Sequence, residues 1–487
     1  MQQLPIADFG KRDVSGLLAF FKHCQSVARE RGRPQLASIT LRVPHIAPLA
    51  VLQSIYAPHE LHCYIERTAS EEAIAGADAV VEGCFSGHGR FAEVKSFAAQ
   101  TLANTLATGE WDVPAAGPSF YCAFTFSDDP AVHCADPPAR VFVPRWQVAR
   151  HGADFSAVAN VLVAADAPLA LLANRVWSAY QRFGAFDYGG DSNGTLTDDS
   201  QRRQFKPLAT SDSSHYRQAV KQALAAIRCG TFEKIVLARR LRLRADIAWQ
   251  PLDTLSRLRE RFPGCHAFSF GLGNGRSFIG ASPESLVSYH NGEVETEAIA
   301  GSIGRGANAL EDAQLAHQLL ASGKDAREHA CVRDSILRRL TAIGLQGQAA
   351  SAPQVLALAN IQHLVTPIRA RGRSGLHLLD LAQTLHPTPA VGGTPRAAAL
   401  AHLRQLEGFE RGLYSGLVGR FDANGEGSLL VGIRSALIEG CDAELYAGAG
   451  IVEGSSPELE WQETEMKLRA LREGLTASVG QPVGLPS

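Results

Sequence analysis

The sequence predicts an α+β fold, and three observations support this class. Stretches with helical spacing and stretches that alternate apolar and polar residues are mixed along the second half of the chain. Their order matches neither the strict strand–helix alternation of a parallel sheet nor an all-β protein. The chain has 487 residues, of which 45% are hydrophobic and 20% charged, so it can bury a substantial globular core.

The N-terminal part, residues 1–190, contains short apolar runs but no chemical cluster. The runs SFYCAFTF (119–126) and RVFVPRW (140–146) indicate strands. Residues 186–214 are rich in Gly, Ser and Asp and lack periodicity, so we expect an exposed connection there. The longer C-terminal part follows this connection.

A helix and a strand open the C-terminal part. Apolar residues recur at helical spacing from Tyr216 to Ile227, with Asp212 near the start and Gly230 just after the end, where glycine suits a left-handed cap. The run 232–243 then alternates side chains between two faces that are both apolar near residue 235. This pattern predicts a central strand.

The remaining elements are mixed in type. Residues 266–300 predict a strand meander that turns at an Asn-Gly pair. Helices are expected at about 308–344, 376–386, 395–407 and 458–475, and strands at about 415–421, 428–437 and 443–452.

Charge and cysteine content exclude several classes of protein. Forty-seven Lys and Arg residues against 49 Asp and Glu residues give a formal charge of -2, so we expect no nucleic-acid partner. The nine cysteines are scattered and form no C-x-x-C pair, which favours reduced, mostly packed thiols. No secretory signal or membrane-spanning stretch is recognisable, so we expect a cytoplasmic protein without a membrane partner.

Lys234 is the first candidate for chemistry. It lies between Phe232 and Val236 on an apolar strand face, where burial would favour the neutral amine that a general base requires. The strand pattern alone leaves open the alternative of an edge lysine in water.

Two acidic pairs predict a cation site. Asp325 and Glu328, and likewise Glu460 and Glu463, are spaced i, i+3 and therefore share a helix face, which Lys467 extends in the second case. One such pair is usually a solvated face. Two converging pairs would repel each other unless a cation joined them, and ligands that are all oxygen suit Mg²⁺ better than zinc.

Other residues could bind an anion. Gly301, Gly448 and Gly450 lie at the ends of expected strands, where glycine lets backbone N–H groups approach a carboxylate, although turns or bulges are the alternative. Arg434 interrupts an apolar strand and could bind a carboxylate or form a structural ion pair. His386 stands where a helix must stop and is by itself a loop histidine.

Eight motifs occur in an order that resembles one family. They are FEKIVLAR, IGASPE, AIAGS, KDAREH, TLHPTPAVGG, GLYSG, GIRSAL and AGAGIVEGSSPELEWQETEMK. Residues 205–475 resemble chorismate-utilising enzymes, most closely isochorismate synthases, whereas residues 1–190 do so only faintly. The resemblance implies one large α+β domain with antiparallel sheets flanked by helices, an integrated N-terminal part and a tail at 476–487.

The resemblance also implies a reaction and its residues. Chorismate would be the substrate, Lys234 the base that activates water for attack at C2, and Glu284 the acid that protonates the departing C4 hydroxyl. The product would be isochorismate. Residues that match the family's substrate site are Gly301, Ser302 (more often threonine in the family), His386, Ala390, Tyr414, Arg434, Gly448, Gly450 and Lys467.

The implied cofactor is Mg²⁺. By the same resemblance, Glu328 and Glu463 would hold the ion directly, and Asp325 and Glu460 would support it through water. The ion would bind the ring carboxylate of the substrate.

Three rival functions remain at this point. A salicylate synthase would share the lysine and the metal site and then eliminate pyruvate; HPTPAVGG and the long N-terminal part weigh against it. Relatives that use ammonia with a glutaminase partner typically lack a lysine matching Lys234, so no obligatory glutaminase subunit is expected. The intact Lys234, Glu284 and four-carboxylate set disfavour a silent binding homologue. The sequence leaves the pathway (siderophore, menaquinone or salicylate) and the oligomeric state open.

Overall fold

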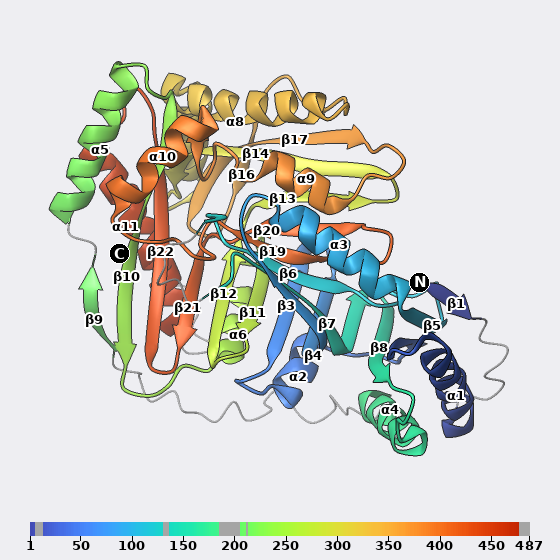
Figure 1. Cartoon of the computed structure of the whole chain (residues 1–487). Coiled ribbons are helices and arrows are strands. Elements are labelled where there is room, and N and C mark those ends of the chain that lie inside the picture. Colours follow the sequence, from blue (N-terminus) through green and yellow to red (C-terminus); the bar gives the residue numbers. More distant parts are fainter. Residues whose placement is uncertain (5–12, 130–135, 185–204, 211–212, 477–487) are drawn as a thin grey trace.

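The computed structural model describes residues 1–4, 13–129, 136–184, 205–210 and 213–476. Its strands lie in one hydrogen-bonded network that is antiparallel except where β5 pairs with β1 and β2, and helices cover the outside (Figure 1). The predicted α+β class, with an antiparallel sheet flanked by helices, is confirmed.

The first elements are mostly strands with four covering helices. They are β1 (Gln2–Leu4), α1 (Val14–Arg31), β2 (Gln35–Arg42), α2 (Pro48–Ile55), β3 (Leu61–Arg67), the 3-10 turn η2 (Thr68–Ser70), β4 (Glu72–Phe85), α3 (Arg90–Ala103), β5 (Thr105–Gly109), β6 (Phe120–Phe124), β7 (Ala139–His151), β8 (Asp154–Val163) and α4 (Leu169–Gly184).

The later elements carry the residues of the expected chemical motifs or lie next to them in the chain. They are β9 (Phe205–Thr210), α5 (Ser213–Arg228), β10 (Lys234–Ala245), α6 (Pro251–Arg261), β11 (His266–Leu272), β12 (Arg276–Ser282), β13 (Ser285–His290), β14 (Glu293–Gly304), α7 (Ala309–Ala321), α8 (Gly323–Ala342), β15 (Gln348–Ala349), β16 (Gln354–Ala357), β17 (Ile361–Arg371), α9 (Leu378–Leu385), β18 (Gly393–Thr394), α10 (Arg396–Glu407), β19 (Leu417–Phe421), β20 (Gly427–Val431), β21 (Ser435–Glu439), β22 (Asp442–Ile451) and α11 (Pro457–Thr476).

Strands from the two parts of the chain pair directly. β3 runs antiparallel to β11, with Leu61 opposite Leu272, and β6 runs antiparallel to β19, with Phe120 opposite Phe421. The rings of Phe120 and Phe421 also stack, with centroids 5.1 Å apart. Backbone hydrogen bonds and core packing therefore join the N-terminal strands to the sheet that carries the chemical motifs.

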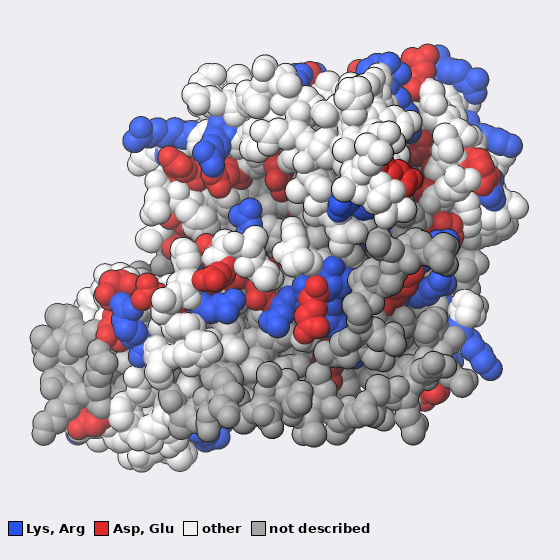
Figure 2. Space-filling model, turned by 180° about the vertical axis from the view of Figure 1, so that it is seen from behind, with Lys and Arg blue, Asp and Glu red and all other residues white. Residues whose placement is uncertain are grey.

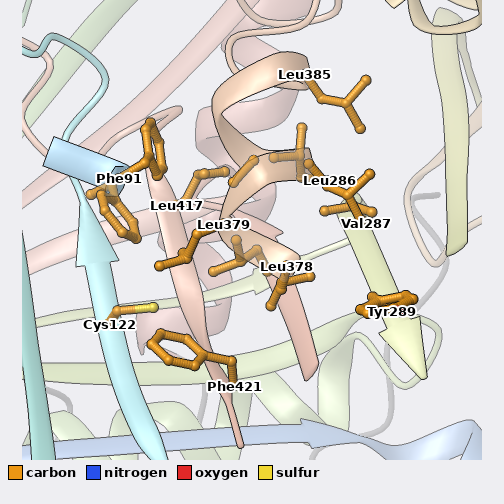
Figure 3. Packing of buried hydrophobic residues seen from close by; sticks show 14 of the residues in the cluster. Phe91, Cys122, Leu286, Val287, Tyr289, Leu378, Leu379, Leu385, Leu417 and Phe421 are labelled. Atoms are coloured by element: carbon orange, nitrogen blue, oxygen red, sulfur yellow. The ribbon is translucent and has the colours of Figure 1, made fainter. Parts of the chain in front are cut away.

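The largest hydrophobic cluster fixes α9 on the sheet (Figure 3). Leu378, Leu379 and Leu385 of this helix are buried against side chains of β13 and β19, among them Leu286 and Phe421. Burying a leucine side chain stabilises a fold by about 2 kcal/mol. The packing therefore holds the C-terminal end of α9, which leads into the HPTPAVGG segment.

Several predicted elements are confirmed. The helix from Tyr216 lies within α5, and Gly230 adopts a left-handed conformation (φ 72°) after its end. β10 pairs with β22 on one side and with β18 and β9 on the other, so it is central. Asn291 and Gly292 have positive φ values, 54° and 76°, as the predicted hairpin turn requires.

The single helix predicted at 308–344 is wrong, because the chain forms two helices. Ser322 separates α7 from α8 with an extended backbone (φ -72°, ψ 112°). Its hydroxyl accepts the N–H of Asp325 at 3.2 Å and so caps α8. The only apolar side chain between Ser322 and Glu328 is Ala326, so the apolar pattern is interrupted at this break.

The single strand predicted at 428–437 is also wrong. β20 ends at Val431 and pairs with β13 and β19, whereas β21 begins at Ser435 and pairs with β12 and β22. Arg434 lies between them with a positive φ of 50°. The chain changes neighbours here, so one straight strand could not satisfy both sets of hydrogen bonds.

Part of the predicted connection at 186–214 is a strand. Residues Phe205–Thr210 form β9 and pair with β10, which corrects the expectation of an exposed connection there. Residues 185–204 and 211–212, including Asp212, and the tail at 477–487 lie outside the described residues.

The surface mixes both signs of charge. In Figure 2, Lys and Arg side chains are interspersed with Asp and Glu side chains on the face shown, as the small net charge of -2 suggests.

The eight cysteines in the described ranges are free, four of them buried, and Cys134 lies outside those ranges. No helix in the described part of the chain is both long enough and apolar enough to cross a membrane.

Candidate active site

Lys234 is buried at the start of β10 and forms an ion pair. Its side chain is 1% exposed, and its Nζ lies 2.9 Å from Oε1 of Glu328 on α8. Gly450 lies opposite Val236 on the adjacent strand β22, where an added Cβ would fall 2.1 Å from Glu328 Oε1. Glycine is thus required for the pair to pack here. The alternative of an edge lysine in water is wrong.

Glu284 is a second buried group, in the turn between β12 and β13. The residue is 4% exposed, and its carbonyl accepts the N–H of Val431 at 3.1 Å. Burial, together with the nearby carboxyl of Glu297, raises the pKa of Glu284 to about 8, against the opposing charge of Lys234. A carboxyl group in this state is protonated near neutral pH and can donate a proton.

The two acidic pairs converge from different helices. Asp325 and Glu328 lie on α8, and Glu460 and Glu463 lie on α11. Lys324 of α8 joins the two helices, because its Nζ lies 2.8 Å from Glu460 Oε1. Burial and then the neighbouring Glu463 raise the pKa of Glu460, as expected for carboxylates that share one region.

Lysines balance much of this negative charge. Lys467 Nζ lies 2.6 Å from Glu463 Oε1 and donates to the carbonyl of Gly448 at 2.9 Å. Burial opposes ionisation of Glu328, but Lys234 and further lysines hold its pKa below the usual range, so it is ionised. Among the described residues, no three His, Cys, Asp or Glu side chains already stand in a metal-holding arrangement.

The chemistry of this donor set fits Mg²⁺. All four carboxylates offer oxygen, and neither His nor Cys competes among them. Burial and neighbouring glutamates still raise the pKa values of Asp325 and Glu460, so the lysines do not balance all of the repulsion and a cation is favoured. Asp325 also packs against Gly301, whose added Cβ would lie 3.0 Å from the Asp325 Cβ. The positive φ of Gly301, 78°, gives a further reason for glycine at this position.

Arg434 does not form the structural ion pair that the sequence left open, since no such pair is found within the described ranges. Its Nη2 lies 3.3 Å from Nε2 of His363 on β17, and Nδ1 of His363 lies 2.9 Å from the Ser302 hydroxyl. Because a guanidinium only donates, Nε2 accepts and Nδ1 carries the proton. Burial and Arg434 keep the pKa of His363 well below its usual range, so the ring is neutral.

Sequence reasoning missed His363. The signal available was a histidine within the apolar run IQHLVT, which by itself resembles a packed core residue. Its contacts with Arg434 and Ser302 identify its role in the site.

His386 and Tyr414 lie in adjoining segments. His386 is 4% exposed, and burial lowers its pKa to about 3, so the neutral ring donates from Nε2 to the carbonyl of Ser415 at 2.9 Å. Tyr414 stacks on Tyr446 with centroids 5.0 Å apart. An added Cβ on Gly448 would lie 3.1 Å from the Tyr414 hydroxyl, so this glycine also leaves room for a neighbouring side chain.

Contacts thus bring the predicted residues together. The HPTPAVGG segment, which contains His386 and Ala390, reaches β10 through the carbonyl of Gly392, which accepts the N–H of Val236 at 2.8 Å.

A cavity of about 10 Å³ lined by Arg434 and Lys467 holds no more than one water molecule, so it is not a substrate chamber.

Comparison with known proteins places these residues in a family. The sequence matches the model of the family described as "Chorismate binding enzyme" over residues 20–476. It is 44% identical over 262 residues to the salicylate biosynthesis isochorismate synthase of Pseudomonas aeruginosa, covering 54% of each chain. It is 35% identical over 260 residues to the isochorismate synthase MenF of Bacillus subtilis, covering 53% of this chain and 55% of that protein. The match spans only about half the length of these curated relatives.

Solved structures share the fold. The menaquinone-specific isochorismate synthase MenF from Escherichia coli aligns with a TM-score of 0.73 at 23% identity, covering 93% of this chain and 99% of that chain. Anthranilate synthase component I from Streptococcus pneumoniae aligns with a TM-score of 0.66 at 23% identity, covering 82% of this chain and 92% of that one.

Proposed function

The chain belongs to the chorismate-binding enzyme family, and on that premise we propose that it is a Mg²⁺-dependent isochorismate synthase. One observation supports this function most strongly. A buried lysine, Lys234, lies close enough to a protonated acid, Glu284, to affect its pKa. The isomerisation of chorismate to isochorismate needs a base and an acid of this kind.

The proposed reaction adds water at C2 and removes the hydroxyl from C4 while the ring double bonds shift. Water is a poor nucleophile and hydroxide a poor leaving group, so both need proton transfer. Lys234 must first release the proton that charges it in the ion pair with Glu328. Its neutral amine then takes a proton from the attacking water, and Glu284 gives its proton to the departing hydroxyl, which leaves as water. The return of a proton from Lys234 to Glu284 through solvent restores both groups, and the product is an isomer of the substrate.

Arg434 and the backbone at Gly448 and Gly450 would receive the enolpyruvyl carboxylate. The neutral His363 supports this role, because it holds one side of the Arg434 guanidinium without neutralising its charge. The other residues assigned to the substrate site are Gly301, Ser302, His386, Ala390, Tyr414 and Lys467.

Glu328 and Glu463 would hold Mg²⁺ directly, and Asp325 and Glu460 would support it through water. When bound, the ion supplies positive charge for the ring carboxylate of the substrate.

The test is product analysis with purified protein, chorismate and Mg²⁺. We expect isochorismate by NMR or chromatography, and no turnover with EDTA. Salicylate and pyruvate as the only products would replace this function with that of a salicylate synthase. A requirement for ammonia would contradict it.

Lys234→Ala tests the assigned base. We expect kcat to fall by about 10²–10⁴-fold, the usual contribution of a general base, with an unchanged circular dichroism spectrum. Lys221→Ala, which removes an exposed lysine of α5, is the control and should retain full activity. An active Lys234→Ala variant would remove Lys234 from the mechanism.

A further inference from the structure

One stretch of the β10 edge lacks a neighbouring strand. On the side away from β22, β10 pairs with β18 at Lys234 and Ile235 and with β9 only from Leu241 onward. The carbonyl of Val236 and the N–H of Ala238 fall between these two pairings. Buried backbone groups of this kind must find other partners, because an unpaired one is costly.

The ion pair of Arg411 and Glu407 supplies those partners. Arg411 donates from Nη2 to the Val236 carbonyl at 2.7 Å, and Glu407 accepts the Ala238 N–H on Oε1 at 2.7 Å. The two side chains are 3% and 2% exposed and also bond to each other, from Arg411 Nε to Glu407 Oε2 at 2.9 Å. Two side chains thus take the place of a strand directly beside the residue assigned as base.

The same guanidinium reaches the opposite segment of the site. Its Nη1 donates to the carbonyl of Val391 at 2.7 Å, next to Ala390. Three residues after Arg411, the N–H of Tyr414 bonds to the Arg411 carbonyl at 3.0 Å. The ring of Phe126, 4.3 Å from the guanidinium carbon, covers the group from one face. The guanidinium therefore joins β10 to the HPTPAVGG segment, and the Arg411 backbone belongs to the turn that carries Tyr414.

We propose that Arg411 is a positioning residue that fixes the strand of Lys234 against the HPTPAVGG segment, through its hydrogen bonds to Val236, Val391 and Glu407. Its effect on turnover rests on the proposed function, whereas its effect on the two segments does not. Lysine cannot replace it, because an ammonium lacks the rigid planar fork that serves these three acceptors.

Arg411→Lys tests this role, with Arg276→Lys as the matched control. Arg276 forms a two-point pair with Asp136, at 2.9 and 3.1 Å, that is less deeply buried, and none of its ion-pair partners belongs to the site. Hydrogen exchange should show joint loss of protection in peptides covering 234–241 and 386–394 in Arg411→Lys, with β3 and β4 still protected. Arg276→Lys should leave both peptides unchanged.

Turnover provides the second measurement. In Arg411→Lys, displacement of the base and the substrate segment should lower kcat by about 100-fold, with a smaller change in KM. In Arg276→Lys, kcat should stay within about 2-fold of the wild-type value, because substitutions away from the site usually have small effects. Equal losses in both variants, loosening of only one segment, or loss of protection throughout the molecule would overturn the proposal. If the wild-type protein makes no isochorismate, the proposed function fails, and the exchange measurement still decides the coupling of the two segments.

Discussion

At the scale of single residues, Glu284 gives the site a defined pH dependence. Its pKa is raised to about 8, mainly by burial and then by Glu297, so it is protonated below that pH and ionised above it. An acid catalyst must be protonated, so kcat/KM should fall as pH rises through about 8. A pH–rate profile from 6 to 10 checks this, and a rate that stays constant from pH 7 to 9 would contradict it.

Glu297→Gln refines the same measurement. Glu297 accepts the N–H of Ser285 at 3.3 Å and raises the pKa of the adjacent Glu284 by its charge. Removing that charge should shift the falling limb of the profile to lower pH. An unshifted limb would show that Glu297 does not influence the acid.

Gly450→Ala should disturb the Lys234–Glu328 pair, and a control on the same strand shows whether the effect is specific to the site. The new Cβ would meet Glu328 Oε1 at 2.1 Å and Lys234 Cε at 3.2 Å, so the ion pair must move. We expect kcat to fall by about 10-fold or more, since displacement of reacting groups by about 1 Å is costly, and weaker Mg²⁺ binding in a titration. Ala449→Gly, on the same strand, is the control and should change stability alone.

At the scale of elements, the break before α8 places two of the carboxylates. The Ser322 hydroxyl caps the helix by accepting the Asp325 N–H at 3.2 Å, and it also donates to the Asp325 carboxylate. Ser322→Ala should cost about 1 kcal/mol of stability and should weaken Mg²⁺ binding. Both can be measured by urea unfolding and calorimetric titration.

Asn308→Ala is the matched control for this prediction. Asn308 caps α7 in the same way, by accepting the Glu311 N–H at 3.0 Å, but no residue assigned to the metal site lies on that helix. It should lose a similar amount of stability and bind Mg²⁺ normally. Equal weakening of Mg²⁺ binding in both variants would contradict a local role for Ser322.

Elements with strong local signals could be predicted from the sequence. The periodicity of α5, the two apolar faces of β10 and the Asn291–Gly292 turn depend on neighbouring residues and backbone preferences alone. The break at Ser322 was equally local and could have been predicted, because S-x-x-D is a capping pattern and Ala326 is the only apolar side chain between Ser322 and Glu328.

Features that depend on distant partners could not be predicted in this way. Arg434 has a positive φ where the chain passes from the neighbours of β20 to those of β21, and His363 joins the site through Arg434 and Ser302, which are 71 and 61 residues away. Arg411 lies in a turn, and its partners Val236 and Val391 are 175 and 20 residues away. Periodicity carries no information about such contacts.

At the scale of the whole molecule, the pairing of N-terminal with C-terminal strands predicts one folding unit. Without residues 1–204, β11 would lose its hydrogen bonds to β3, and β19 would lose those to β6. Both exposed edges would carry apolar residues, among them Phe270 and Phe421, which are buried in the intact chain. Unpaired apolar edges of this kind favour aggregation.

We therefore expect the fragment 205–487 to be insoluble or to lack a cooperative thermal transition, whereas the full chain unfolds in a single calorimetric step. Co-expression with the fragment 1–184 should restore soluble protein, because the β3–β11 and β6–β19 ladders need no covalent link between the parts. A fragment 205–487 that folds alone and turns over chorismate would show instead that the N-terminal part is a separate domain. The strand ladders would then act as an interface between two domains, and the core around Phe120 and Phe421 would contribute little to the site.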